Sequence, residues 1–176
     1  MKQTIKFVVP LAGAAVLALG SMAFAQDSAN RMSNPDSTFA FKAAQGGLAE
    51  VQMGQLATQK ASNSDVKAFG QQMVDDHSKA NEELKEVAAK KGMTLPSSIS
   101  TKDQATYEHL SKLEGAAFDR AYIADMVKDH RTDVAEFEKE GNSGSDPDIK
   151  GFASKTLPTL KHHLEMAETT NAKVKK

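Results

Sequence analysis

The chain has 176 residues, with 22 lysines and arginines against 23 aspartates and glutamates, and it has no cysteine. This balance of charge argues against nucleic-acid binding, which depends on clustered positive charge. The lack of cysteine excludes disulfide scaffolds, zinc ribbons and cysteine nucleophiles. The 5 histidines and 8 methionines are therefore the side chains of greatest chemical interest.

The first 25 residues have the pattern of a secretory signal peptide. Lys2 and Lys6 precede an apolar run over residues 7–19, and Ala23-Phe24-Ala25 places small residues around one variable position. The apolar run is too short for a membrane span. We expect cleavage after Ala25, export to the periplasm and no stable membrane insertion of the mature chain; an uncleaved anchor is the alternative. Residues 26–35 are polar and are predicted to form a disordered leader.

Residues 36–172 are predicted to form one all-α domain, because no segment shows the two-residue alternation of a strand. We expect four long helices and a short one, with residues 173–176 as a frayed tail. The expected helices cover residues 36–61, 62–91, 102–113, 115–140 and 146–172, the short one lying within a connector over residues 92–113.

Capping residues support these starts. Any of residues 36–38 (Asp-Ser-Thr) can cap the first helix, and Ser62 with Asp65 resembles a capping box for the second. Asp146-Pro147 supplies a cap and a first-turn proline for the last helix, after a turn over residues 141–145.

An internal repeat predicts how the helices are arranged. Residues 65–70 (DVKAFG) match residues 148–153 (DIKGFA) 83 positions later, and Phe39 aligns with Phe118 at an offset of 79, a difference that we assign to a longer second turn. Each half is then a helical hairpin, and two hairpins must pack together to bury their apolar stripes. The connector of about 22 residues is long enough to cross the length of a helix. The sequence therefore predicts a four-helix bundle with a long crossover connector, which is a ferritin-like topology.

One polar side chain per long helix falls within the apolar stripe that a period of 3.6 residues directs toward the core. These side chains are Glu50, His77, His130 and His163. Glu50 and His77 lie at similar depths, about 18 and 22 Å from the first turn. His130 and His163 lie at less similar depths from the second turn. Pro158 can kink the last helix and bring His163 to the common level, or the four groups do not converge.

Burial of a carboxylate or an imidazole is costly unless the group finds a partner. In one arrangement, Glu50 and the three histidines ligate zinc, iron or copper. In the other, Glu50 hydrogen-bonds one or two histidines and water fills the remaining space. Both arrangements remain open at this stage. The positions expected to support the ligands, or to add to them, are Asp76, Tyr122, Asp129 and Asp133.

Five segments of the chain resemble the bacterial family catalogued as domain of unknown function 4142, whose members are exported and described as ferritin-like. The segments are residues 49–54 (AEVQMG), 73–77 (MVDDH), 118–122 (FDRAY), 126–130 (MVKDH) and 157–163 (LPTLKHH). The resemblance covers residues 36–172 and implies a fold and a compartment, because the family has no settled activity.

The resemblance to di-iron ferritins is much looser. Those proteins carry Glu-x-x-His motifs on two helices, whereas Val74 and Leu160 stand three residues before His77 and His163. The core face of the third long helix also carries His130 in place of an acid. A single core acid favours a mononuclear, imidazole-rich site over di-iron chemistry.

Three functions follow as hypotheses. The leading one is an exported helical protein that binds a transition metal for metal buffering or envelope stress defence. The sequence leaves enzymatic activity open and favours a binding protein over an enzyme. The second is a structural or interaction module of the cell envelope with a hydrogen-bonded polar core. The third is a ferritin-like oxidative enzyme, which requires two metals per chain. The sequence leaves the oligomeric state open.

Overall fold

A computed structural model describes residues 34–175, and within this range it contains five helices and no strand. The helices are α2 (Pro35–Lys60), α3 (Ser64–Lys90), α4 (Thr101–Ser111), α5 (Gly115–Ser143) and α6 (Pro147–Val174). The predicted all-α class is confirmed. None of these helices is both long enough and apolar enough to span a bilayer. The predicted signal peptide, residues 26–33 of the predicted leader and Lys176 lie outside the described residues.

α2, α3, α4 and α6 begin where a side-chain oxygen accepts hydrogen bonds from the free N–H groups of the first turn, whereas α5 has no such cap. Asn34 caps α2 and Asn63 caps α3, so the predicted cap within residues 36–38 and the capping box at Ser62 were both wrong. Pro35 consequently belongs to α2 and not to the leader. Asp146 caps α6, as predicted.

The last two helices are longer than the sequence indicated. α5 continues to Ser143, so residues 141–143 are helical and not part of a turn. α6 reaches Val174, where Lys173 Nζ pairs with Asp65 Oδ2 at 2.7 Å, so these two residues do not fray. Both hairpin turns are therefore three residues long, and a single offset of 83 positions relates the two halves. The proposed alignment of Phe39 with Phe118 was wrong.

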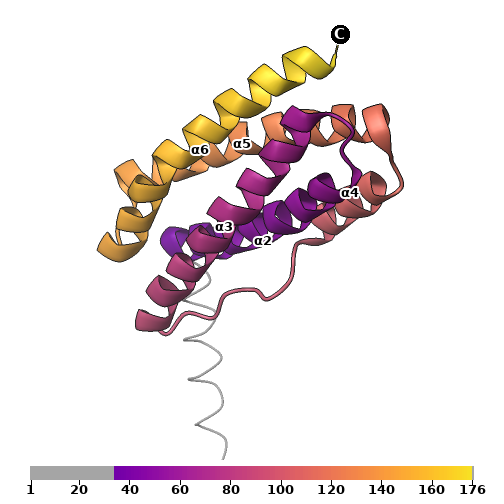
Figure 1. The fold of residues 1–176 in the computed structure, drawn as a ribbon. Helices are drawn as coiled ribbons and strands as arrows, with labels where there is room; N and C mark the ends of the chain where they lie inside the picture. Colours follow the sequence, from indigo (N-terminus) through magenta and orange to yellow (C-terminus); the bar gives the residue numbers. More distant parts are fainter. Residues whose placement is uncertain (1–33, 176) are drawn as a thin grey trace, which may run out of the picture.

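The four long helices pack as two antiparallel hairpins, α2 with α3 and α5 with α6 (Figure 1). α3 also packs on α6 and α2 on α5, which joins the hairpins. The end of α3 lies beside the start of α6, where Lys91 Nζ is 2.9 Å from Asp146 Oδ2. The end of α2 lies beside the start of α5, where Lys60 Nζ bonds the Leu113 carbonyl at 3.3 Å. The segment with α4 therefore runs from one end of the molecule to the other.

Each hairpin turn is held by an aspartate of the other hairpin. Asp119 of α5 accepts hydrogen bonds from Ser62 N and Asn63 N at 3.1 and 2.9 Å. Asp36 of α2 accepts hydrogen bonds from Ser145 N and Asp146 N at 3.2 and 2.7 Å. Asp36 and Asp119 are 83 positions apart, and so are the donors. The two halves are thus related by an approximate two-fold symmetry that includes their polar contacts.

Two glycines bring α2 and α3 close together. A Cβ on Gly54 would lie 2.7 Å from the Gly70 carbonyl oxygen, and a Cβ on Gly70 would lie 2.6 Å from Ala57 Cβ. Neither position has room for a larger side chain, because each added Cβ would press against the backbone carbonyl oxygen of the other glycine, which cannot move aside as a side chain can.

The core consists of two apolar clusters with a polar layer between them. One cluster includes Met53, Phe69, Met73, Tyr122 and Met126, and lies toward the α2–α3 turn. The other includes Phe39, Ala44, Leu84, Phe137, Ile149, Phe152 and Leu160, and lies toward the opposite end. On α3, α5 and α6, the buried histidine separates the members of one cluster from those of the other, and on α2 Glu50 lies at the edge of the first cluster, next to Ala49.

Glu140, which lies near the α5–α6 turn, makes the stability of the folded protein depend on pH. Burial, followed by the neighbouring Asp36, raises the pKa of Glu140 to about 7, with Asp146 acting in the same direction and Lys139 against it. In the unfolded chain the group ionises near its ordinary value. The stabilisation from protonated Glu140 is therefore complete at acid pH and is lost as the pH rises toward 7 and above.

We expect Glu140→Gln to raise the unfolding free energy by about 1 kcal/mol at pH 8 and to change it little at pH 4. Urea unfolding followed by circular dichroism at the two pH values checks this. A gain at pH 4 equal to that at pH 8 would contradict the assignment.

Candidate metal centre

The polar layer is formed by Glu50 of α2, His77 of α3, His130 of α5 and His163 of α6, the four residues that the helical period directs inward. All four are buried, with exposed fractions of 1, 6, 0 and 0%. The uneven depths of His130 and His163 along their helices do not keep them apart. Pro158 lies inside α6, five residues before His163.

Each imidazole has one nitrogen in a polar contact. His130 Nδ1 donates to the Met126 carbonyl at 3.0 Å, and His163 Nε2 donates to Asp76 Oδ2 at 3.0 Å. His77 Nδ1 lies 2.8 Å from Glu50 Oε2. Because a neutral imidazole carries one proton, these contacts leave the second nitrogen of each ring as a lone pair when Glu50 is ionised.

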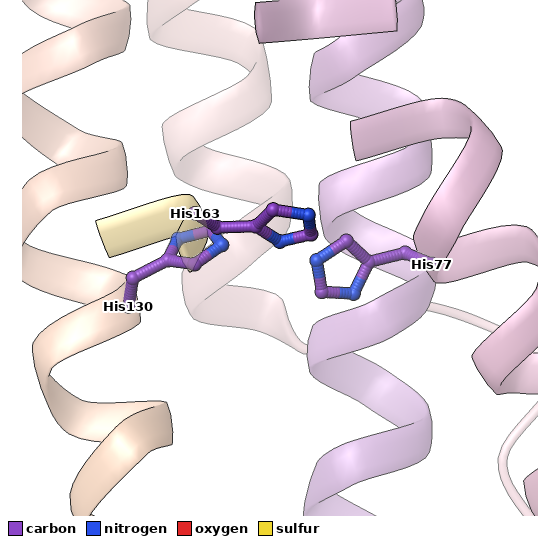
Figure 2. Close-up of side chains that lie close together, drawn as sticks. All are labelled: His77, His130 and His163. Atoms are coloured by element: carbon purple, nitrogen blue, oxygen red, sulfur yellow. The ribbon is translucent and has the colours of Figure 1, made fainter. Parts of the chain in front are cut away.

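The three remaining nitrogens are His77 Nε2, His130 Nε2 and His163 Nδ1, and among residues 34–175 none of them has a hydrogen-bond partner. The rings converge, with centroids 5.3 to 5.8 Å apart (Figure 2). One ligand atom from each histidine lies within 4.8 Å of the other two. Such a spacing suits three ligands of one ion.

Glu50 adds an oxygen to this group. Its Oε1 atom lies 3.4 Å from His130 Nε2 and has no hydrogen-bond partner in the described part of the chain. An ionised carboxylate oxygen and an imidazole lone pair repel each other. The contact is stable only with a proton or a cation between the two atoms.

The electrostatics of the layer favour neutral imidazoles. Burial lowers the pKa of His77 to about 4, of His130 to about 3 and of His163 to about 4. Burial also raises the pKa of Glu50, and the negative charge of Asp129 adds to this effect. A bound cation would favour the neutral imidazoles further, because it takes their lone pairs, and it would oppose the effect on Glu50, because it stabilises the carboxylate.

The four supporting positions differ in what they contact. Asp76 holds His163 and also accepts a hydrogen bond from Gln72. Burial alone would raise the pKa of Asp76, but these two hydrogen bonds bring it below its ordinary value. Tyr122 is fully buried, and no residue in the described range bonds its hydroxyl; burial followed by the charge of Glu50 raises its pKa.

Asp129 and Asp133 lie on the half-buried side of α5. Burial and the neighbouring Asp125 raise the pKa of Asp129 to about 6. Burial and Glu50 raise the pKa of Asp133. Asp133 is closer to the centre than its supporting role suggested, because it forms a second group of potential ligands with Glu50 and His130. The internal repeat could have identified Asp133 from the sequence, because an offset of 83 positions places Asp133 at the position equivalent to Glu50.

The donor set fits a transition metal ion. Imidazole nitrogens with one carboxylate suit zinc, iron and copper, and each imidazole has the outer hydrogen-bond acceptor that metal-ligating histidines usually have. The four atoms of the layer that have no hydrogen-bond partner, one from Glu50 and one from each histidine, are the ones that an ion would bind.

Comparison with known proteins gives a fold and a family. Three solved structures are similar: a DUF305 fragment from Deinococcus radiodurans, a DUF305 protein from Streptomyces coelicolor described as secreted, and CopM in its Cu(I)-bound form. Their identities are 13, 12 and 16% and their TM-scores 0.70, 0.69 and 0.63. The matches cover 79, 81 and 76% of this chain and 96, 94 and 93% of those chains.

At these identities the likeness shows the fold alone. No curated protein matches the chain. The family model described as "Domain of unknown function (DUF4142)" matches residues 21–170. The chain therefore belongs to the DUF4142 family.

Proposed function

We propose that this protein binds one transition metal ion through His77, His130 and His163, with Glu50 as the neighbouring carboxylate. The observation that carries the proposal is the set of three buried imidazole nitrogens without partners, each on a ring whose other nitrogen is in a polar contact. Leaving three polar atoms unsatisfied in a core costs about 1–3 kcal/mol each, and a bound ion removes that cost.

Copper is the first ion to test, with zinc and iron for comparison. Divalent copper binds nitrogen sites more tightly than the other first-row ions do. A protein of similar fold, CopM, has been solved with Cu(I) bound. Three neutral imidazoles can hold either copper oxidation state.

The cellular setting that fits this site is the cell envelope. The signal-peptide pattern of residues 1–25 and the similar fold of a DUF305 protein described as secreted support export, and we place the protein in the periplasm. The two hairpins with a connector along their length support a ferritin-like four-helix bundle. The role proposed there is metal buffering or defence against metal stress.

A structural role is the second candidate, because the contacts of His77 with Glu50 and of His163 with Asp76 also satisfy part of the polar layer without an ion. This candidate predicts a protein whose melting temperature does not respond to metals or chelators. An oxidative di-metal enzyme has less support, because the two groups of potential ligands share His130.

The test is a metal titration of protein purified without a histidine tag. We expect one Cu²⁺ or Zn²⁺ per chain by plasma mass spectrometry. We also expect a rise in melting temperature that a chelator reverses, because an ion bound only to the folded state stabilises it by mass action. A protein that stays metal-free and melts at the same temperature with Cu⁺, Cu²⁺, Zn²⁺ or Fe²⁺ contradicts the proposal.

A further inference from the structure

Beside the three imidazoles lies a second group of potential ligands, Glu50, His130 and Asp133. One ligand atom of each lies within 4.8 Å of the other two. Glu50 is 1% exposed, and its Oε1 atom has no hydrogen-bond partner within residues 34–175. Glu50 and Asp133 are 83 positions apart and occupy equivalent places in the two halves. The group offers a cation two carboxylate oxygens and one nitrogen.

The two groups cannot hold ions at the same time through His130. His130 Nδ1 carries the proton that it donates to the Met126 carbonyl, so only Nε2 has a lone pair. One lone pair binds one ion, and two divalent ions a few ångströms apart repel each other strongly. The groups are therefore alternative positions of a single ion.

A narrow cavity borders two members of the second group, Glu50 and Asp133, on a side away from His130 and His163. It has a volume of about 20 Å³ and is lined by Glu50, His77 and Asp133 among others, but by neither His130 nor His163. This volume is sufficient for about one water molecule or one small ion. An ion in the cavity meets the two carboxylates before it meets the full set of imidazoles.

Asn81 stands at the outer side of this cavity. Its side chain lines both the cavity and an open groove of about 480 Å³ between α2, α3 and residues 93–97. Asn81 Oδ1 lies over Gly47, where an added Cβ would be only 2.1 Å away. Asn81 is therefore shared by the linings of the groove and the cavity.

We infer that Asp133 and Glu50 form an uptake position, at which a divalent cation from the groove binds before it moves to the three imidazoles. The inference rests on the proposed function. His130 belongs to both positions and stays bound while the ion exchanges Asp133 for His77 and His163. Asp133 is thus a positioning residue that sets the rate of transfer and not the final affinity.

The test compares Asp133→Asn with wild type by stopped-flow mixing with Cu²⁺ and a metallochromic indicator at low ionic strength. Cu²⁺ is the probe because nitrogen sites bind it most tightly among divalent first-row ions. We expect the uptake and release rate constants both to fall about tenfold, with the dissociation constant unchanged within about twofold. Asp125→Asn is the matched control, because it removes the same charge from the same helix away from the cavity, and its rates should equal those of wild type.

The outcomes separate the uptake position from other roles. If Asp133→Asn binds the ion more weakly and releases it faster, Asp133 is a ligand of the resting ion and the inference is overturned. Unchanged uptake and release rates also overturn it. Asn81→Ala tests the route separately: it should speed uptake and release equally, and unchanged rates show that the ion does not pass Asn81. A wild-type protein that takes up none of Cu⁺, Cu²⁺, Zn²⁺ and Fe²⁺ overturns the proposed function and this inference together, whereas uptake of Cu²⁺ with unaltered variant rates overturns the inference alone.

Discussion

Replacing His130 by alanine should abolish tight metal binding, because His130 belongs to both groups of potential ligands. Loss of a residue that only supports a ligand typically lowers metal affinity about 10–100-fold. Loss of His130 itself should exceed that range. A competition titration with a chromophoric chelator measures the affinity, and metal analysis after purification measures the bound ion.

Two further variants separate ligation from folding. His130→Asn retains a donor near the Met126 carbonyl but lacks the Nε2 lone pair, so it should fold and still lose the ion. His162→Ala removes an exposed histidine beside His163 and should bind metal as wild type does. If His130→Asn bound the metal with wild-type affinity, the ion would be held by residues other than His130.

The helical period in the sequence was sufficient to identify the residues that meet in the core. Each of four polar residues interrupts an apolar stripe, and their burial in the structure agrees with the prediction that they face the core; they are Glu50, His77, His130 and His163. Periodicity succeeds here because a helix four or more turns long rotates by a fixed angle per residue, and so its buried face is determined by spacing alone.

Distances along the helices were less predictable, because they depend on where each helix ends. The predicted turn over residues 141–145 made the distances of His130 and His163 from the turn differ too much. It also prevented the two halves from aligning at a single offset of 83 positions. Gly141 favoured that turn by its low helix propensity, but the chain continues as helix to Ser143. With the correct boundary, the equivalence of Glu50 and Asp133 follows directly.

Contacts between hairpins could not be derived from local patterns. Asp36 and Asp119 each hold the turn of the other hairpin, from more than fifty positions away in the sequence. Neither residue has a local signal that distinguishes it from an ordinary acid near the start of a helix. Their role is visible only once the two hairpins are placed together.

The close contact of α2 with α3 gives the second large effect. We expect Gly70→Ala to lower the unfolding free energy by about 2 kcal/mol, although alanine is about 1 kcal/mol better than glycine in a helix. The added Cβ would lie 2.6 Å from Ala57 Cβ and 2.9 Å from the Gly54 carbonyl oxygen, so the helices must separate. Gly151→Ala is the matched control, because a Cβ at that helical position meets nothing within 4 Å and should stabilise the protein.

The same separation should weaken metal binding. Glu50 lies one turn from Gly54 on α2, and His77 lies two turns from Gly70 on α3, so the contact between the glycines sets the approach of Glu50 Oε2 to His77 Nδ1, now 2.8 Å. Urea unfolding and the chelator competition should therefore both change in Gly70→Ala, and neither should worsen in Gly151→Ala. A Gly70→Ala protein as stable as wild type would show that α2 and α3 can move apart at little cost. In that case their close packing does not position the site.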